Sequence, residues 1–165
     1  MSSDLQHELF TPDPVTGFGS RAALISRLRL AVGPVGGPSV LAIFGLDGLD
    51  DFETAHGVER TDDVIAALAR ELARIVCPEG DCYTTRRREL CVHFDHPLDE
   101  VQSVLSAAAI SLRREGAISS IGVDLGVAEL PGQATGPIAA LVIADRSLTT
   151  ARKARRARSA VPLGR

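Results

Sequence analysis

The chain has 165 residues, of which 45% are hydrophobic, and a formal net charge of −3. This length and apolar content suffice for one domain with a packed core, and they exclude a disordered chain. The slight acidic excess gives no overall attraction for nucleic acid, so no specific nucleic-acid partner is expected. The N-terminus lacks the features of a signal peptide and no apolar run approaches ~18 residues, which predicts a cytoplasmic protein without a membrane segment.

Residues 1–12 are expected to form an N-terminal lead with a short helix over 3–10. Pro12 and Pro14 end this lead, because proline has no backbone N–H and cannot continue a helix. Ser20 is a suitable N-cap for the helix that follows. The expected apolar side of that helix consists of Leu24, Ile25, Leu28, Leu30 and Val32.

The near-continuous apolar run at 39–44 predicts a central strand buried on both faces. A short helix is expected over 49–56 and a long one over 61–76, with Thr61 as its candidate N-cap. The long helix presents apolar residues at helical spacing: Val64, Ile65, Leu68, Leu72, Ile75 and Val76.

Residues 82–94 predict two strands around an arginine-rich turn, with Leu90, Val92 and Phe94 alternating toward the core. The remaining pattern predicts a helix over 98–114, a strand over 121–130 and a last helix over 137–156, in that order. Such an order implies a sheet covered by helices. The cysteines and histidines show no metal-ligand spacing, so no metal and no cofactor are expected.

Positive charge gathers at two places in this acidic chain. One is the hairpin turn at 86–88. The other is the end of the last helix, where five cations occur within seven residues: Arg152, Lys153, Arg155, Arg156 and Arg158.

Four segments carry a family resemblance in chain order. Residues 13–21 resemble D-x-L-T-G-L-x-N-R, residues 45–57 resemble D-x-D-x-F-K-x-I-N-D-x-x-G, residues 123–128 resemble S-x-G-V-A, and residues 144–152 resemble A-D-x-A-L-Y-x-A-K. These are motifs of the GGDEF domain of diguanylate cyclases. The resemblance implies an α/β fold of the nucleotidyl-cyclase type with a ferredoxin-like core, in which helices flank a mostly antiparallel five-stranded sheet. The domain would span 13–158, followed by a C-terminal tail at 159–165.

The signature itself is degenerate. The resemblance aligns the five signature positions with Arg86, Arg87, Arg88, Glu89 and Leu90. A shift by one residue would place the signature at 87–91, but the first alignment keeps the alternating apolar residues on the core side. Both glycines that let the family's backbone approach a nucleotide are absent.

The family binds Mg²⁺ with an acid at the end of the first strand and an acid in the third signature position. Here those positions are Gly45 and Arg88. A guanidinium repels a divalent cation, so the resemblance implies that the cyclase reaction is lost and that neither a catalytic residue nor a metal site remains. The product-inhibition motif R-x-x-D is also absent, because Arg74 and Asp81 are seven positions apart.

The nucleotide-binding positions of the family are partly kept. Its guanine-reading residues map to Glu53 and Asp62, and carboxylates accept hydrogen bonds from guanine. Alternatively, Glu53 is a solvated helix residue and Asp62 a charge that suits a helix N-terminus. The phosphate-side cations map to Arg152 and Arg156, which with Arg88 and its two neighbours would form a basic mouth. Alternatively, these cations are a solvated helix end and a solvated turn.

The leading interpretation is a catalytically inactive GGDEF-like domain that acts in regulation or protein interaction in bacterial nucleotide signalling. Its expected ligands are a protein partner and a guanine nucleotide bound without metal, and the resemblance allows a homodimer. Two other interpretations remain open. One is an enzyme with altered nucleotide chemistry, and the other is an interaction scaffold that binds no nucleotide.

Overall fold

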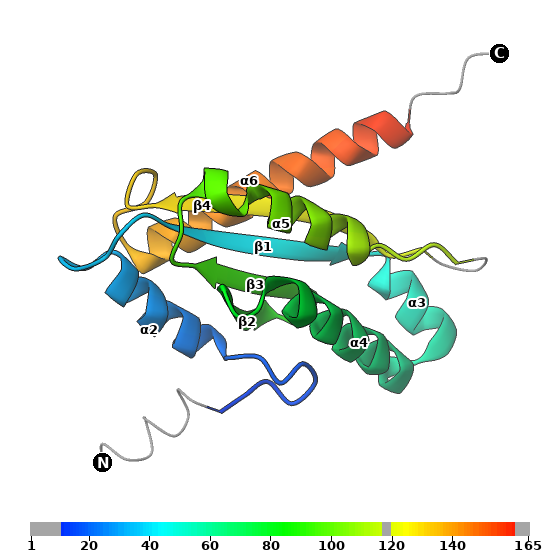
Figure 1. The fold of residues 1–165 in the computed structure, drawn as a ribbon. Helices are drawn as coiled ribbons and strands as arrows, with labels where there is room; N and C mark the ends of the chain where they lie inside the picture. The colour runs from blue at the N-terminus through cyan, green and yellow to red at the C-terminus, as the bar shows by residue number, and fades with distance from the viewer. Residues whose placement is uncertain (1–10, 117–119, 161–165) are drawn as a thin grey trace.

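The computed structural model describes residues 11–116 and 120–160, so the expected helix over 3–10 and most of the expected tail lie outside the described residues. The described chain forms a sheet of four strands in the order β2-β3-β1-β4, in which all neighbours are antiparallel (Figure 1). The strands are β1 (Ser39–Asp47), β2 (Gly80–Arg86), β3 (Glu89–Phe94) and β4 (Gly122–Leu130).

The expected number of five strands is wrong for the described residues. Gly19 does pair with Tyr83 at the outer edge of β2, but only as an isolated parallel bridge. The pairing cannot extend, because the next residue, Ser20, already caps a helix. A second isolated bridge joins Arg114 to Ile121 just before β4.

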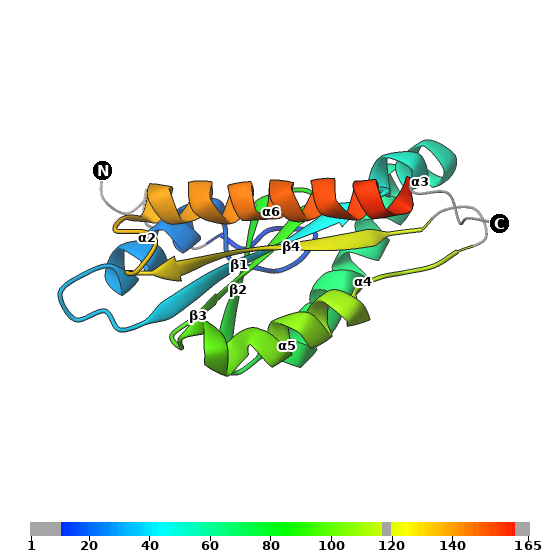
Figure 2. The same ribbon diagram turned by 90° about the horizontal axis from the view of Figure 1, so that it is seen from above.

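Helices cover both faces of the sheet, which gives three layers (Figure 2). Helices α2 (Arg21–Ala31) and α6 (Pro137–Ser159) lie on one face, and α4 (Val58–Val76) and α5 (Leu98–Ser111) lie on the other. The short helix α3 (Leu49–His56) follows the end of β1 and leads into α4. None of the helices in the described part of the chain has both the length and the apolar character needed to cross a membrane.

Strand β1 is the centre of the core, as its apolar run predicts. Its residues are buried from Ser39 to Leu46, and only Asp47 at its end is partly exposed. Alternate side chains point to opposite faces of the sheet, so the strand supplies two hydrophobic clusters. Phe44 packs on the side of α4 and α5, whereas Ile43 packs on the side of α2 and α6. Burying each large apolar side chain stabilises the fold by about 1.5–3 kcal/mol.

Of the two predicted helix N-caps, one is confirmed and the other is wrong. The hydroxyl of Ser20 accepts a hydrogen bond from the backbone N–H of Ala23 at 3.2 Å, which confirms the predicted N-cap of α2. Leu30, however, is 66% exposed and does not belong to the buried side of that helix. Thr61 is also not an N-cap, because α4 begins three residues earlier; its buried hydroxyl donates to the carbonyl of Gly57 at 2.9 Å.

Helix α6 lies unusually close to the edge strand β4. A side chain at Gly126 would collide with the carbonyl of Ala144 and with Leu148 on the helix, so only glycine allows this approach. At this short separation the hydroxyl of Ser147 accepts a hydrogen bond from the N–H of Val127 at 3.1 Å. The side-chain oxygen of Gln133 similarly accepts from the N–H of Glu129 at 3.0 Å.

His93 is a buried histidine on β3. The residue is only 1% exposed, and neither ring nitrogen has a hydrogen-bond partner among the described residues. Burial lowers the pKa of His93 below its usual 6.5, and the charge of Arg27 lowers it further. Asp95, whose carboxylate lies 3.9 Å from Nδ1, and Asp81 act in the opposite direction without reversing the shift.

This burial predicts that acidification destabilises the fold. Below about pH 6.5 an unfolded histidine takes up a proton that buried His93 resists, so the free energy of unfolding falls as the pH drops from 6.5 toward the lowered pKa. Urea unfolding at about pH 7 and about pH 5.5 measures the effect. The His93→Leu variant should lose most of this pH dependence. The control His96→Gln, which removes an exposed imidazole, should keep it; equal slopes in both variants would contradict the assignment.

Candidate anion-binding site

The arginine-rich hairpin has its turn at Arg87 and Arg88, between β2 and β3. Thr84 pairs with Leu90 and Arg86 pairs with Glu89, with a register shift between the two pairs that marks a β-bulge. Leu90, Val92 and Phe94 are buried in the cluster on the side of α4 and α5, as the alternation predicts. No non-glycine residue in the described chain has a positive φ, so the arginines form this turn without entering the left-handed region.

All three hairpin arginines form ion pairs within the chain. Arg86 lies 3.2 Å from the buried carboxylate of Glu89 and 3.5 Å from that of Asp145 on α6. Arg88 forms an ion pair with Asp50 on α3. The third signature position therefore carries a cation that is paired with a carboxylate of α3.

Arg87 joins the two expected guanine-reading residues. One guanidinium nitrogen forms an ion pair with Glu53 on α3, and the other lies 2.8 Å from Asp62 on α4. Hydrogen bonds from Arg87 to Asp62 and Glu53 raise the pKa of its guanidinium above its ordinary value. The structure thus brings Glu53 and Asp62 together. Asp62 does not lie in the first turn of α4, which begins at Val58, and its carboxylate is paired with Arg87.

Gly45 lies beneath an arginine of α6. A Cβ atom built on Gly45 would contact the guanidinium of Arg152 and lie 3.0 Å from the Cδ1 atom of Leu148. A carboxylate at this position would therefore require Arg152 to move away. Among the described residues, no three His, Cys, Asp or Glu side chains form a group that could hold a metal ion. The residues at Gly45 and Arg88 do not fit the Mg²⁺ that the fold family implies.

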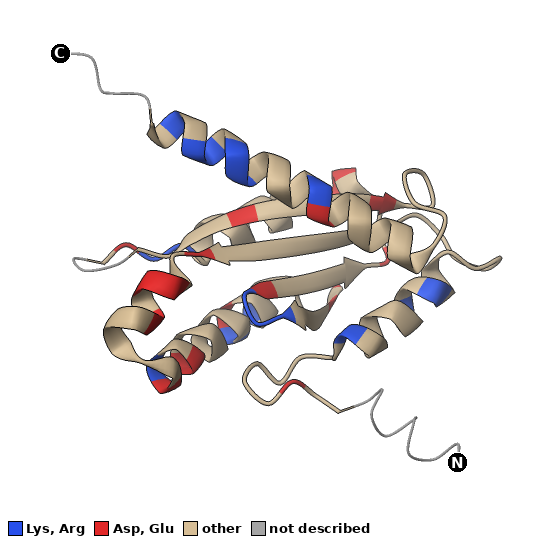
Figure 3. Cartoon of the chain, turned by 180° about the vertical axis from the view of Figure 1, so that it is seen from behind, with Lys and Arg blue, Asp and Glu red and all other residues tan. Residues whose placement is uncertain are grey.

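The structure collects the expected phosphate-side cations around one cavity of about 480 Å³, between the hairpin, the end of β1 and α6. In Figure 3 the basic residues lie along the C-terminal half of α6 and at the hairpin, and acidic residues lie opposite them on α3 and α4. This cavity is the basic mouth, and its lining residues are Leu46, Asp47, Arg86, Arg87, Arg88, Glu89, Arg152 and Arg156. Arg88, Arg152 and Arg156 thus share one cavity, whereas Glu53 and Asp62 lie outside its lining.

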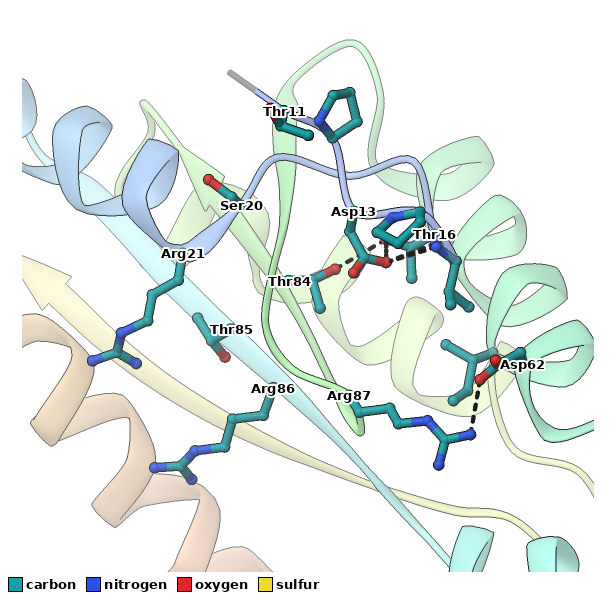
Figure 4. A pocket seen from close by; sticks show the side chains of 14 residues that line it. Thr11, Asp13, Thr16, Ser20, Arg21, Asp62, Thr84, Thr85, Arg86 and Arg87 are labelled. Atoms are coloured by element: carbon teal, nitrogen blue, oxygen red, sulfur yellow. Dashed lines mark hydrogen bonds and ion pairs between the residues drawn. The ribbon is translucent and has the colours of Figure 1, made fainter. Parts of the chain in front are cut away.

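A second cavity of about 560 Å³ lies on the other side of Arg86 and Arg87. It opens between the turn before α2, strand β2 and helix α4, and Asp62 is part of its wall (Figure 4). In the figure the side chain of Arg87 reaches across to Asp62, whereas Arg86 points toward α6. The turn before α2 is held by Asp13, whose carboxylate accepts hydrogen bonds from the N–H and the hydroxyl of Thr16, both at 2.8 Å.

Beside the basic mouth lies an ion-pair cluster that the sequence motifs do not predict. Arg155 on α6 donates to Asp124 at 3.0 Å and also forms an ion pair with Asp47 at the end of β1. Burial would raise the pKa of Asp47, but the hydrogen bond and charge of Arg155 and the charge of Arg156 outweigh it and hold this pKa below its usual value. One member of this cluster could be recognised in the sequence, because Asp47 is the second acid of the D-x-D motif. The pairing depends on β1–β4 register, which puts Asp124 opposite Gly45.

Comparison with solved structures identifies the architecture. The FimX GGDEF domain from Pseudomonas aeruginosa superposes with a TM-score of 0.77 at 22% identity, covering 87% of this chain and 94% of that one. The chain has the GGDEF-domain fold. The GGDEF domain of DgcB from Caulobacter crescentus, solved with c-di-GMP, matches with a TM-score of 0.74 at 22% identity, covering 88% and 89%.

A third GGDEF-fold structure is the diguanylate cyclase SiaD of Pseudomonas aeruginosa in complex with its activator SiaC. It matches with a TM-score of 0.78 at 23% identity, covering 92% of this chain and 62% of that one. No protein-family model and no curated protein matches the sequence. The similarity therefore establishes the GGDEF-domain fold, and the function must be argued from the site.

The Arg155 cluster predicts a marked loss of stability in Arg155→Ala. Asp124 is only 5% exposed, so the substitution leaves a buried carboxylate without its partner. Because Arg155 itself is partly exposed, we expect a decrease of about 2 kcal/mol in the free energy of unfolding, measured by urea denaturation. Lys153→Ala, which removes an exposed cation from the same helix, is the matched control and should change stability little. Similar losses in both variants would contradict the buried pair.

Proposed function

We propose that this chain is a catalytically inactive GGDEF-like domain that acts in regulation or protein interaction in bacterial nucleotide signalling, in the cytoplasm. The observation that carries the proposal is the position of two cations. Arg152 lies over Gly45, and Arg88 occupies the third signature position, where the resemblance implies the two metal-binding acids. Phosphoryl transfer that depends on Mg²⁺ needs carboxylate oxygens at these places.

Electrostatics supports this loss of activity. A divalent cation placed between two guanidiniums would be repelled, and the repulsion grows as the site excludes water. The nearest carboxylates do not compensate, because Asp47 is paired with Arg155, and Glu89 accepts hydrogen bonds from Thr85 and Arg86. No step of the cyclase reaction is therefore assigned to the residues of this chain.

The basic mouth supports a binding role that needs no metal. Guanidiniums bind phosphate oxygens through paired, charge-assisted hydrogen bonds. Arg152 has no ion pair among the described residues, and Arg156 lies 3.9 Å from Asp47 as its nearest carboxylate partner. These two side chains are thus the ones most available to a polyphosphate. In this proposal they hold a nucleotide as a regulatory ligand.

A protein-interaction scaffold that binds no nucleotide is the second candidate. It is favoured by the hairpin, where all three arginines already have carboxylate partners within the chain. SiaD, which has the same fold, was solved with an activator protein, and a protein partner for this chain is part of the proposal. An enzyme with altered nucleotide chemistry remains the alternative that an activity screen would detect.

The first consequence is the absence of cyclase activity. Incubating the protein with GTP and either Mg²⁺ or Mn²⁺ should yield no cyclic di-GMP by chromatography, because both metal-binding acids are replaced. An active diguanylate cyclase under the same conditions is the positive control. Turnover at an ordinary enzymatic rate of about 1 s⁻¹ or more would overturn the proposal.

The second consequence concerns nucleotide binding by α6. Calorimetry should show that EDTA leaves GTP affinity almost unchanged, and that Arg152→Ala/Arg156→Ala weakens it at least about tenfold, since each charge-assisted hydrogen bond contributes ~1.5–3 kcal/mol. Lys153→Ala/Arg158→Ala removes the same charge from the same helix but outside the basic mouth, and should have a smaller effect. Equal effects of the two double variants would assign the binding to general charge attraction. Loss of binding in EDTA would reveal a metal site.

A further inference from the structure

The Glu53–Arg87–Asp62 cluster joins three elements that are distant in sequence. Glu53 comes from α3, Asp62 from α4 and Arg87 from the hairpin turn. Each carboxylate contacts a different terminal nitrogen of the same guanidinium. All three side chains are partly exposed, so a ligand could reach them. Arg87 lines both cavities and Asp62 lines the cavity of about 560 Å³, whereas Glu53 lines neither.

The two carboxylates of the cluster are complementary to a ligand that donates hydrogen bonds. Two carboxylates that converge on one planar group select a ligand edge with neighbouring N–H donors, which is what a guanidinium presents. The N1–H and N2–H₂ edge of guanine presents the same pattern. Arg87 therefore satisfies the acceptors that a guanine base would need, and it does so from within the chain.

The two carboxylates bind whichever partner interacts with them more strongly, Arg87 or a guanine base. The guanidinium is charged, so it adds Coulomb attraction to its hydrogen bonds with the two carboxylates, whereas guanine offers neutral donors only. Arg87 is also covalently tethered beside its acceptors, whereas a free base must lose translational freedom to bind. Both effects favour Arg87 over a free base.

We propose that Arg87 makes this site indifferent to the nucleobase, so that its ligands are polyphosphate compounds recognised by their phosphates and not by guanine. The inference rests on the proposed binding of polyphosphate by Arg152 and Arg156. Arg87 is thus a specificity-determining residue that keeps Glu53 and Asp62 closed to a base. Its removal would expose two acceptors for guanine and two negative charges that repel other nucleotides.

The test compares three probes, GTP, ATP and inorganic tripolyphosphate, by calorimetry in EDTA. Wild type should bind GTP and ATP with affinities within about threefold of each other, because neither base is read. In Arg87→Ala the ratio of GTP affinity to ATP affinity should rise at least about tenfold, which corresponds to regained hydrogen bonds to charged acceptors.

Arg88→Ala is the matched control, since it removes the same charge from the same turn but leaves Arg87 on its carboxylates. It should weaken GTP and ATP binding by equal factors. A tenfold GTP preference in wild type, or an unchanged ratio in Arg87→Ala, would overturn the inference while leaving phosphate binding intact. If wild type and Arg87→Ala bind none of the three probes at millimolar concentration, both the inference and the proposed nucleotide binding fail. Catalytic inactivity would be unaffected by that result.

Discussion

The arrangement of the whole site depends on the close contact between α6 and β4 at Gly126. Because no side chain separates them there, the helix lies directly on the sheet and Leu148 packs against the strand. An α-helix advances by one turn every 3.6 residues, so fixing Leu148 also fixes Arg152 one turn later and Arg155 and Arg156 in the turn after that. Those three side chains consequently reach Gly45, Asp47 at the end of β1 and Asp124 on β4.

Charge pairing defines the shape of the hairpin more than it stabilises the protein. Partly exposed ion pairs such as those of Arg87 and Arg88 each contribute about 0–1 kcal/mol, because water screens them and the long side chains lose freedom. Their effect is directional: Arg88 is drawn toward α3 and Arg87 toward both α3 and α4. The pair between Arg155 and Asp124 differs because that carboxylate is buried, and its loss is costly.

Most of the fold could be predicted from local sequence patterns, whereas contacts between elements distant in sequence could not. The apolar run of β1, the alternation in β3 and the Ser20 cap depend on neighbouring residues and can be read from the sequence. The fifth strand and the Thr61 cap were wrong because they depend on where a neighbouring helix begins. In the site, the resemblance placed Arg88, Arg152 and Arg156 together. It could not predict that Arg87 holds Glu53 and Asp62, because ion pairs between distant elements depend on side-chain reach.

The edges of the sheet limit how a partner can attach. An open edge strand offers unpaired N–H and C=O groups, and a second chain can extend the sheet by pairing with them. Here Ser147 and Gln133 already accept from two outward N–H groups of β4, and at the other edge the backbone of Gly19 pairs with Cys82 and Thr84 of β2. Strand addition would have to break these bonds first. A binding partner is therefore directed to side chains on the helices and the hairpin, and growth of a fibre by edge-to-edge strand pairing is opposed at both edges.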